Sequence, residues 1–445
     1  MFKAVRAPHH IADRAAPLGP LRLNPTGGAR RKLRMATSYT APMSRFLPCI
    51  FLAAILHAQP LPVSTPEQGG FSPQRLERLH QSFEAVTKAN TPPGAITLIV
   101  HDGHIVDWRA YGLRDVEGRR PMEKDTICRA YSMTKPITTV AVMMLVEEGK
   151  LQLSDRVDQY IPEFKDVKVY KGGTVEKPEL AAPERPMTVK HLLTHTAGLT
   201  YGWGNDNVSE MYKKAKVFDV TSLKEFIDKL TKLPLIANPG DKYEYSVALD
   251  VLGYLVQVVS GKPFDQFVQE RIFDPLKMTD SHFVLPDAKR ARLAKIYGLK
   301  DGKLEAREGL EAKGVPFGGM GLFCTIGDYA RFAQMLANSG QLEGVRLLGR
   351  KTVDLMMMNH LVGLARPTTG GDDSDGFGLG GAVRIEPAKS GRPGSEGLYG
   401  WDGAASTRFR VDRKEKMVFL LFTQWMPFET NLLNRYETLV YQALE

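Results

Sequence analysis

Ser132 and Lys135 stand three residues apart where a helix is predicted to begin. At this spacing two side chains lie on one helix face, so the lysine nitrogen can approach the serine oxygen. Such an arrangement can activate a serine nucleophile without a histidine. The N-terminal end of a helix is also positive, which favours an oxyanion formed beside Ser132.

The flanking sequence predicts the elements that would hold this pair. Residues 126–131 read as an extended run, and Pro136 fits a first helical turn, where its missing N–H costs little. Apolar residues then recur at helical spacing until Gly149 ends the segment. These apolar positions are Ile137, Val140, Ala141, Met144 and Leu145.

Two later segments could complete a site. Tyr245 follows a turn that begins at Pro239 and precedes an apolar helix predicted over 247–256, so its ring could project into a cleft. Glycines flank Trp401 just before a strand predicted over 407–411, which indicates a close backbone approach to another strand or to a ligand. Taken singly, each feature also fits a capped helix or a core aromatic ring.

In order, Ser132-x-x-Lys135, Tyr245-Ser246 and Trp401-x-Gly403 resemble the three-element signature of the serine β-lactamase and penicillin-binding-protein superfamily. The closest resemblance is to the branch of class C enzymes, D-alanyl-D-alanine carboxypeptidases and, above all, family VIII carboxylesterases. The likeness runs from about Gly70 to the C-terminus. It is supported by three further segments, residues 189–199, 319–325 and 328–332.

The resemblance implies a role for each motif residue. Ser132 would attack a carbonyl and become acylated, while Lys135 and Tyr245 would share one proton, with the choice of base left open. The backbone N–H groups of Ser132 and Ala404 would form the oxyanion hole. We expect neither a cofactor nor a metal.

Two departures from the β-lactamase pattern bear on the substrate. Val247 stands where class C enzymes carry an asparagine, and Trp401 where they carry a lysine that attracts a substrate carboxylate. We therefore expect Val247, Trp401, Asp402 and Gly403 to contact a small ester or amide substrate, with ester cleavage or ester-to-alcohol acyl transfer favoured. The alternatives are a β-lactamase, a D-alanyl-D-alanine carboxypeptidase and a non-catalytic peptidoglycan-binding module.

The net charge of +9 is concentrated at the N-terminus. Residues 1–58 carry nine Lys or Arg and one acidic residue, so the rest of the chain is nearly neutral and gives no reason to expect a nucleic-acid partner. Residues 43–58 combine a charged start, a short apolar run and a small terminal residue, which predicts a signal peptide and an exported, periplasmic or extracellular protein. This run is too short for a stable membrane span. Residues 1–42 read as an upstream start-site artefact or, alternatively, as a transit segment.

The remaining pattern mixes helices and strands. We expect an α/β (α+β) fold, in which an antiparallel sheet flanked by helices is formed by 59–150 and 316–445, and an inserted helical lobe by 151–315. A helix over 72–88 and a hairpin of 95–100 with 105–110, joined at Asp102-Gly103, begin the sheet part. The sequence leaves the oligomeric state open.

Other features are predicted to be structural. His191 and His195 have the spacing of a zinc pair, but no glutamate base lies between them and no third ligand is evident. After loss of the leader, Cys128 and Cys324 remain as two buried thiols or one disulfide.

Overall fold

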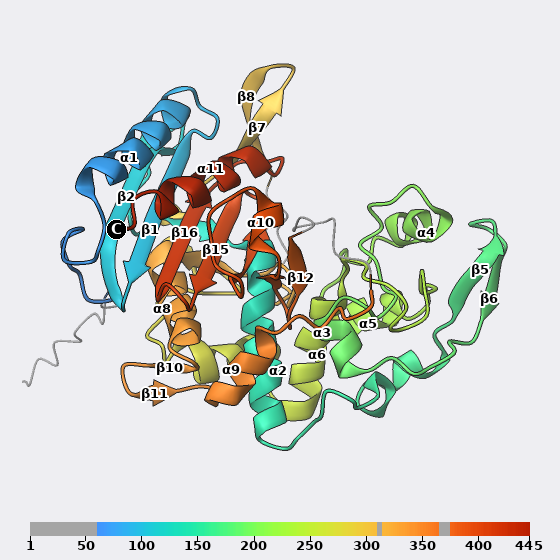
Figure 1. Cartoon of the computed structure of the whole chain (residues 1–445). Coiled ribbons are helices and arrows are strands. Elements are labelled where there is room, and N and C mark those ends of the chain that lie inside the picture. The colour runs from blue at the N-terminus through green and yellow to red at the C-terminus, as the bar shows by residue number, and fades with distance from the viewer. Residues whose placement is uncertain (1–59, 309–313, 365–373) are drawn as a thin grey trace, which may run out of the picture. The chain divides into compact units, whose positions relative to one another are not determined.

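The computed structural model describes residues 60–308, 314–364 and 374–445. An eight-stranded antiparallel sheet is its largest element (Figure 1). Its strands are β1 Gly94–His101, β2 His104–Asp115, β3 Arg120–Pro121, β12 Asp375–Phe377, β13 Ala382–Arg384, β14 Tyr399–Gly403, β15 Thr407–Asp412 and β16 Met417–Thr423. The spatial order is β12-β13-β14-β15-β16-β1-β2-β3, so the first and last parts of the chain meet where β16 pairs with β1. The predicted leader, residues 1–58, lies outside the described residues.

The central strands are apolar on both faces because both faces are covered. Along β1, Ile96 and Leu98 face one core cluster, whereas Ala95 and Ile99 face the other. The alternation follows from the two-residue period of a strand.

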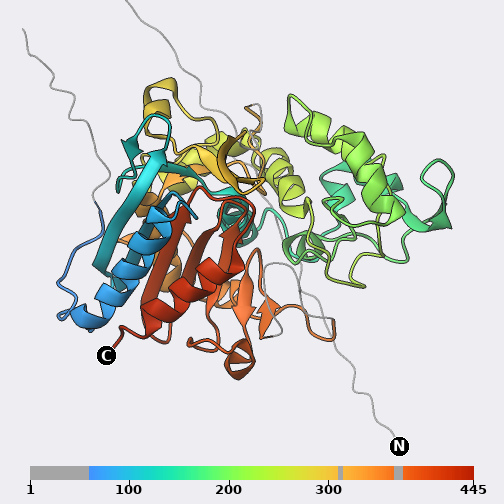
Figure 2. The ribbon, with the colours of Figure 1, turned by 90° about the horizontal axis from the view of Figure 1, so that it is seen from above.

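Helices α1 Pro73–Lys88 and α11 Thr430–Tyr441 lie side by side over one face of the sheet (Figures 1 and 2). Helix α8 Ile326–Ala337 covers the other face, where it contacts β16, β15 and β1. On that side α8 shares its core cluster with α2 Thr134–Glu147, the helix that begins beside Ser132. The predicted antiparallel sheet flanked by helices is therefore confirmed.

Local signals account for the ends of several elements. The β1–β2 hairpin turns at Asp102 and Gly103, with φ values of 46° and 80°, as expected for an Asp-Gly turn between antiparallel strands. Helix α6 Ala248–Ser260 ends at Gly261, whose φ is 71°.

In the middle of the chain, short helices alternate with loops. Its helices are α3 Val189–Leu193, α4 Asn207–Ala215, α5 Leu223–Leu230, α6 and α7 Phe264–Val268, and α6 packs against α2. It also contains two hairpins, β5 Val169–Gly173 with β6 Pro178–Ala181, and β7 Ile296–Lys300 with β8 Lys303–Arg307. Tyr297 of β7 donates its backbone N–H to Gln424, next to the large sheet. Since the described residues form one compact unit, the boundaries at 151 and 316 stay a prediction.

Two further strand pairs are β4 Ile127–Arg129 with β9 Phe323–Thr325, and β10 Gln341–Leu342 with β11 Val345–Arg346. The remaining α-helices are α9 Arg350–Met356 and α10 Pro387–Ser390. None of the helices described combines the length and apolar character needed to cross a bilayer.

Candidate active site

Ser132 lies at a sharp corner between a strand and a helix. Strand β4 ends at Arg129, a short 3-10 turn covers Tyr131–Met133, and α2 begins at Thr134. Tyr131 has a φ of 46°, an uncommon conformation for a large side chain, and this reverses the chain just before the serine. Ser132 is consequently part-exposed at the N-terminal end of α2, whereas both of its neighbours are buried.

Lys135 lies one turn further on and is fully buried. Its Nζ lies 3.1 Å from Ser132 Oγ and donates to the Gly319 carbonyl at 2.8 Å. The same nitrogen lies over the aromatic rings of Tyr245 and Tyr201, 4.7 and 5.4 Å from their centroids. Aromatic faces and a carbonyl therefore take the place of water around this amine.

Tyr245 reaches Ser132 from the segment that leads into α6. Its hydroxyl lies 2.7 Å from Ser132 Oγ, and the indole Nε1 of Trp401, on β14, donates to the same hydroxyl at 3.2 Å. The structure thus brings Ser132, Lys135, Tyr245 and Trp401 together from three separate parts of the chain.

A pocket of about 200 Å³ opens above Ser132. Two aromatic residues that the sequence analysis missed lie at its rim: Trp203, which is 66% exposed, and Phe428, which is 39% exposed. Trp203 stacks on Tyr201 with ring centroids 4.6 Å apart. The lining consists of Ser132, Trp203, Tyr245, Trp401, Asp402, Gly403, Ala404 and Phe428. In the sequence, Trp203 is marked only by its place between Gly202 and Gly204.

At Trp401-x-Gly403, the backbone packs against the chain segment just before Ser132. A Cβ on Gly403 would lie 2.4 Å from the Ala130 carbonyl oxygen, so only glycine fits this approach. Ala404 follows directly and lines the same pocket as Ser132. The predicted close approach is thus to another backbone segment, two residues before Ser132.

Asp402 and Val247, both predicted to contact the substrate, make their main contacts within the protein. Asp402 lines the pocket, but its carboxylate binds Arg408 at 2.8 and 2.9 Å and Arg410 at 2.8 Å. Burial would raise the pKa of Asp402, yet the charges of these two arginines outweigh it and lower the pKa to about 2. Val247 is fully buried in the core and is not among the pocket-lining residues.

The histidines and cysteines have structural surroundings. His191 caps α3, and His195 accepts the backbone N–H of Ser246 on Nδ1 while its ring packs 4.8 Å from that of Tyr245. Burial, and then the charge of Lys135, hold the pKa of His195 well below its ordinary value, so the ring is neutral. Cys128 and Cys324 face each other across β4 and β9 as free, buried thiols. Within the described residues, no group of three or more His, Cys, Asp or Glu side chains could hold a metal ion.

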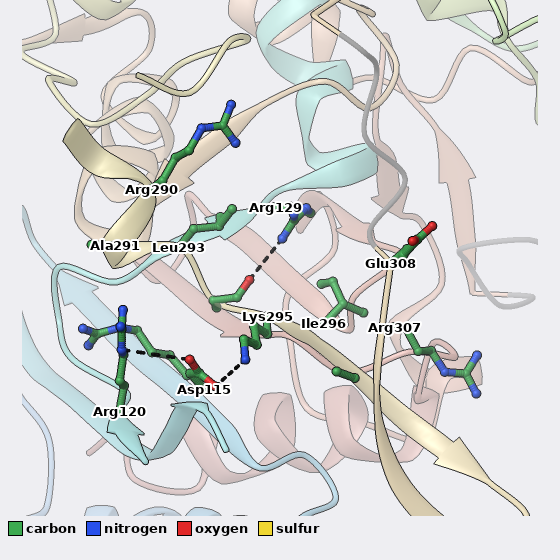
Figure 3. A pocket seen from close by; sticks show the side chains of 13 residues that line it. Asp115, Arg120, Arg129, Arg290, Ala291, Leu293, Lys295, Ile296, Arg307 and Glu308 are labelled. Atoms are coloured by element: carbon green, nitrogen blue, oxygen red, sulfur yellow. Dashed lines mark hydrogen bonds and ion pairs between the residues drawn. The ribbon is translucent and has the colours of Figure 1, made fainter. Parts of the chain in front are cut away.

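A second cavity, of about 660 Å³, is lined by several arginines (Figure 3). Its charges are engaged within the protein: Lys295 binds Asp115 at 2.7 Å, Arg120 lies 4.0 Å from the same carboxylate, and Arg129 donates to the Ala294 carbonyl at 3.1 Å. Ser132 is not part of its lining. Arg120 and Arg129 are therefore partnered within the protein.

Residues 79–442 match the family model described as Beta-lactamase. The chain belongs to this family. Esterase EstB of Burkholderia gladioli is 32% identical over 373 residues, which cover 78% of this chain and 89% of the relative. Lovastatin esterase of Penicillium rubens is 30% identical over 372 residues, with coverages of 76% and 90%.

A solved structure is also similar in fold. Unliganded simvastatin synthase (LovD) from Aspergillus terreus is similar with a TM-score of 0.71 at 26% identity, covering 84% of this chain and 98% of that one. The predicted superfamily and its fold are thereby confirmed. With esterases among its relatives, this member of the β-lactamase family is a serine hydrolase that acts on small molecules.

Proposed function

We propose that the protein is an exported carboxylesterase that acts through an acyl-enzyme on Ser132. The observation that carries this proposal is the position of Ser132 Oγ, 3.1 Å from Lys135 Nζ and 2.7 Å from the Tyr245 hydroxyl, beneath an aromatic pocket. Both groups that could accept the serine proton are within hydrogen-bond reach. The esterases among the relatives support the reaction class.

In the acylation step, Ser132 Oγ attacks the ester carbonyl carbon as its proton passes to the Tyr245–Lys135 pair. The oxygen of the tetrahedral intermediate accepts from the N–H groups of Ser132 and Ala404, donors that are typically worth about 3 kcal/mol each. The C–O bond to the alcohol then breaks, and the pair returns the proton to the departing alcohol. An acyl group remains bound to Ser132.

In the second step, water attacks the acyl-serine along the same proton path. The carboxylic acid leaves and Ser132 is regenerated. An alcohol in place of water would instead yield a new ester, and the likeness to simvastatin synthase makes this acyl transfer the second candidate activity.

The pocket lining supports an uncharged, apolar substrate. None of its eight described residues is Lys or Arg, and the carboxylate of Asp402 is engaged by two arginines. The aromatic rings of Trp203, Trp401 and Phe428 offer apolar surface to an acyl or alcohol chain. A β-lactam or peptide carboxylate would find no cation among these residues, so β-lactamase and carboxypeptidase activities are disfavoured.

The test uses the purified protein, its Ser132→Ala variant and two substrates, p-nitrophenyl butyrate and nitrocefin. We expect butyrate hydrolysis that Ser132→Ala abolishes, and little hydrolysis of nitrocefin. Labelling by a fluorophosphonate, followed by intact mass, should occur in wild type only. Comparable turnover of nitrocefin would point to a β-lactamase, and no labelling to a binding module.

The export part of the proposal rests on the predicted signal peptide at 43–58. Expression in a bacterial host followed by cell fractionation and N-terminal sequencing tests it. A mature N-terminus near residue 59 in the periplasm or medium is the expected result, and full-length protein retained in the cytoplasm would contradict it.

A further inference from the structure

Asp250, in the first turn of α6, is a fully buried carboxylate beside the candidate site. Its Oδ1 accepts the backbone N–H of Gly319 at 2.7 Å. The carbonyl of the same glycine accepts from Lys135 Nζ at 2.8 Å. One glycine therefore links this carboxylate to the lysine that contacts Ser132.

The second carboxylate oxygen of Asp250 is tightly packed. Oδ2 is buried and has no hydrogen bond of normal geometry to the described residues. A Cβ on Gly319 would lie 2.5 Å from Oδ2, so the backbone packs directly on the carboxylate. A buried carboxylate left without full pairing is costly, which makes a purely incidental placement a poor explanation.

Two side chains act on the charge of Asp250. The positive charge of Lys135, on α2, acts on this carboxylate electrostatically, and the phenol of Tyr201, in the loop after α3, acts on it as a hydrogen-bond partner. Burial raises the pKa of Asp250 to about 6, and the Lys135 charge and the Gly319 N–H oppose this rise. Tyr201 also lowers the pKa of Asp250, and Asp250 in turn raises that of Tyr201.

We infer that Asp250 is a positioning residue that fixes Lys135 beside Ser132 through Gly319 and gives its ammonium a buried counter-charge. The inference rests on the proposed function, because it assigns the Lys135–Tyr245 pair the handling of the serine proton. A nearby anion favours the state in which the lysine is charged and the phenol has released its proton. That is the state in which Tyr245 can accept the proton of Ser132.

If Asp250 acts through its charge, Asp250→Asn should have a different effect than if it acts only through packing. The amide oxygen can still accept the Gly319 N–H, so packing is kept while the charge is removed. Asp250→Asn also removes the group whose pKa lies near 6. The acid limb of the pH–rate profile should therefore move to lower pH. A purely structural role would lower the rate equally at every pH.

The experiment measures kcat and KM for p-nitrophenyl butyrate from pH 5 to 10, together with thermal unfolding. Its matched control is Asp265→Asn, which changes a part-exposed first-turn aspartate on the neighbouring helix α7. We expect Asp250→Asn to lower kcat about tenfold, to shift the acid limb to lower pH and to change KM little, while the control behaves as wild type. An unshifted profile or an unchanged kcat would overturn the inference.

A second variant keeps the inference testable if Asp250→Asn fails to fold. Tyr201→Phe removes the phenol that lowers the pKa of Asp250, so the carboxylate should protonate at higher pH and the acid limb should move upward, opposite to the shift in Asp250→Asn. No movement of that limb would count against the inference. Fluorophosphonate labelling distinguishes failure of the proposed function from failure of this inference. An unlabelled wild type contradicts both. A labelled wild type with an unchanged Asp250→Asn contradicts this inference alone.

Discussion

The indole N–H of Trp401 donates to the phenol oxygen of Tyr245 over 3.2 Å. The lysine of the β-lactamase pattern is replaced here by a neutral donor that contacts one of the two groups proposed to move the serine proton. An N–H donor stabilises a phenolate more than a phenol. Trp401 therefore has two proposed roles, as a pocket wall and as a hydrogen-bond partner of Tyr245.

Trp401→Phe separates these roles because phenylalanine keeps an aromatic wall and lacks the N–H. Hydrogen bonds to charged groups contribute about 1.5–3 kcal/mol, so kcat for p-nitrophenyl butyrate should fall by at least about tenfold. The acid limb of the pH–rate profile should move to higher pH, since the phenolate loses a donor. Steady-state kinetics from pH 5 to 10 check both effects. A raised KM with unchanged kcat would show that Trp401 acts only as part of the pocket wall.

Trp203 is expected to select for chain length. Its ring is 66% exposed at the pocket rim, where a long acyl chain could cover it. Each buried methylene is worth about 0.8 kcal/mol, so Trp203→Ala should raise KM for p-nitrophenyl octanoate at least about fivefold and leave the acetate ester within about twofold. Leu180→Ala, which removes a 46% exposed leucine on β6, is the matched control and should alter neither value. Equal KM changes for the two esters would place the acyl chain elsewhere.

The buried ion pairs of Asp402 predict a pH-dependent stability. Arg408 and Arg410 lower its pKa from 3.8 to about 2 against the opposing effect of burial, so the folded state binds this proton less tightly than the unfolded state. The stabilisation is therefore complete above about pH 4 and is lost as the pH falls toward 2. Glu437 of α11 completes the cluster, 3.3 Å from Arg408.

Asp402→Asn should accordingly destabilise the protein by about 3 kcal/mol at pH 7, because two buried arginines lose their charged partner. The gap between the variant and wild type should narrow below pH 4. Urea unfolding at several pH values measures it. Glu396→Gln breaks an exposed pair with Lys414 and should unfold like wild type. A gap that stays constant down to pH 3 would show that packing, and not the charge of Asp402, is responsible.

Sequence reasoning reached those parts of the site whose geometry is local. Ser132 and Lys135 are three residues apart, so a single helical turn fixes their contact, and the Asp102-Gly103 turn similarly fixes the pairing of β1 with β2. Tyr245 and Trp401 were identified by their motifs and not by geometry. Their meeting at one hydroxyl depends on how α6 packs against α2 and β14 against the turn Tyr131–Met133, which no local pattern encodes.

Other contacts could not be inferred because they join distant segments. Trp203 lies in a loop after α3 and Phe428 precedes α11, yet both line one pocket. The arginines that bind Asp402 lie on the paired strand β15, so the direction of its carboxylate depends on the strand register, in which Asp402 pairs with Arg408. A pattern of alternating residues gives the faces of a strand but not its partner.

The register of β14 also makes Gly403 irreplaceable. A Cβ there would lie 2.4 Å from the Ala130 carbonyl oxygen and 2.2 Å from Thr407 Oγ1, so β14 or the Ser132 segment would have to shift. Because the proposed oxyanion donors, Ser132 and Ala404, lie on these two segments, Gly403→Ala should lower kcat by at least about a hundredfold, a loss typical of one missing oxyanion donor, and lower the melting temperature. Gly172→Ala on β5 is the control, since its Cβ would meet only the flexible carboxylate of Glu179, at 3.1 Å. Gly403→Ala with wild-type kcat would show that the two segments can separate without disturbing the oxyanion hole, which would remove Ala404 from the proposed mechanism.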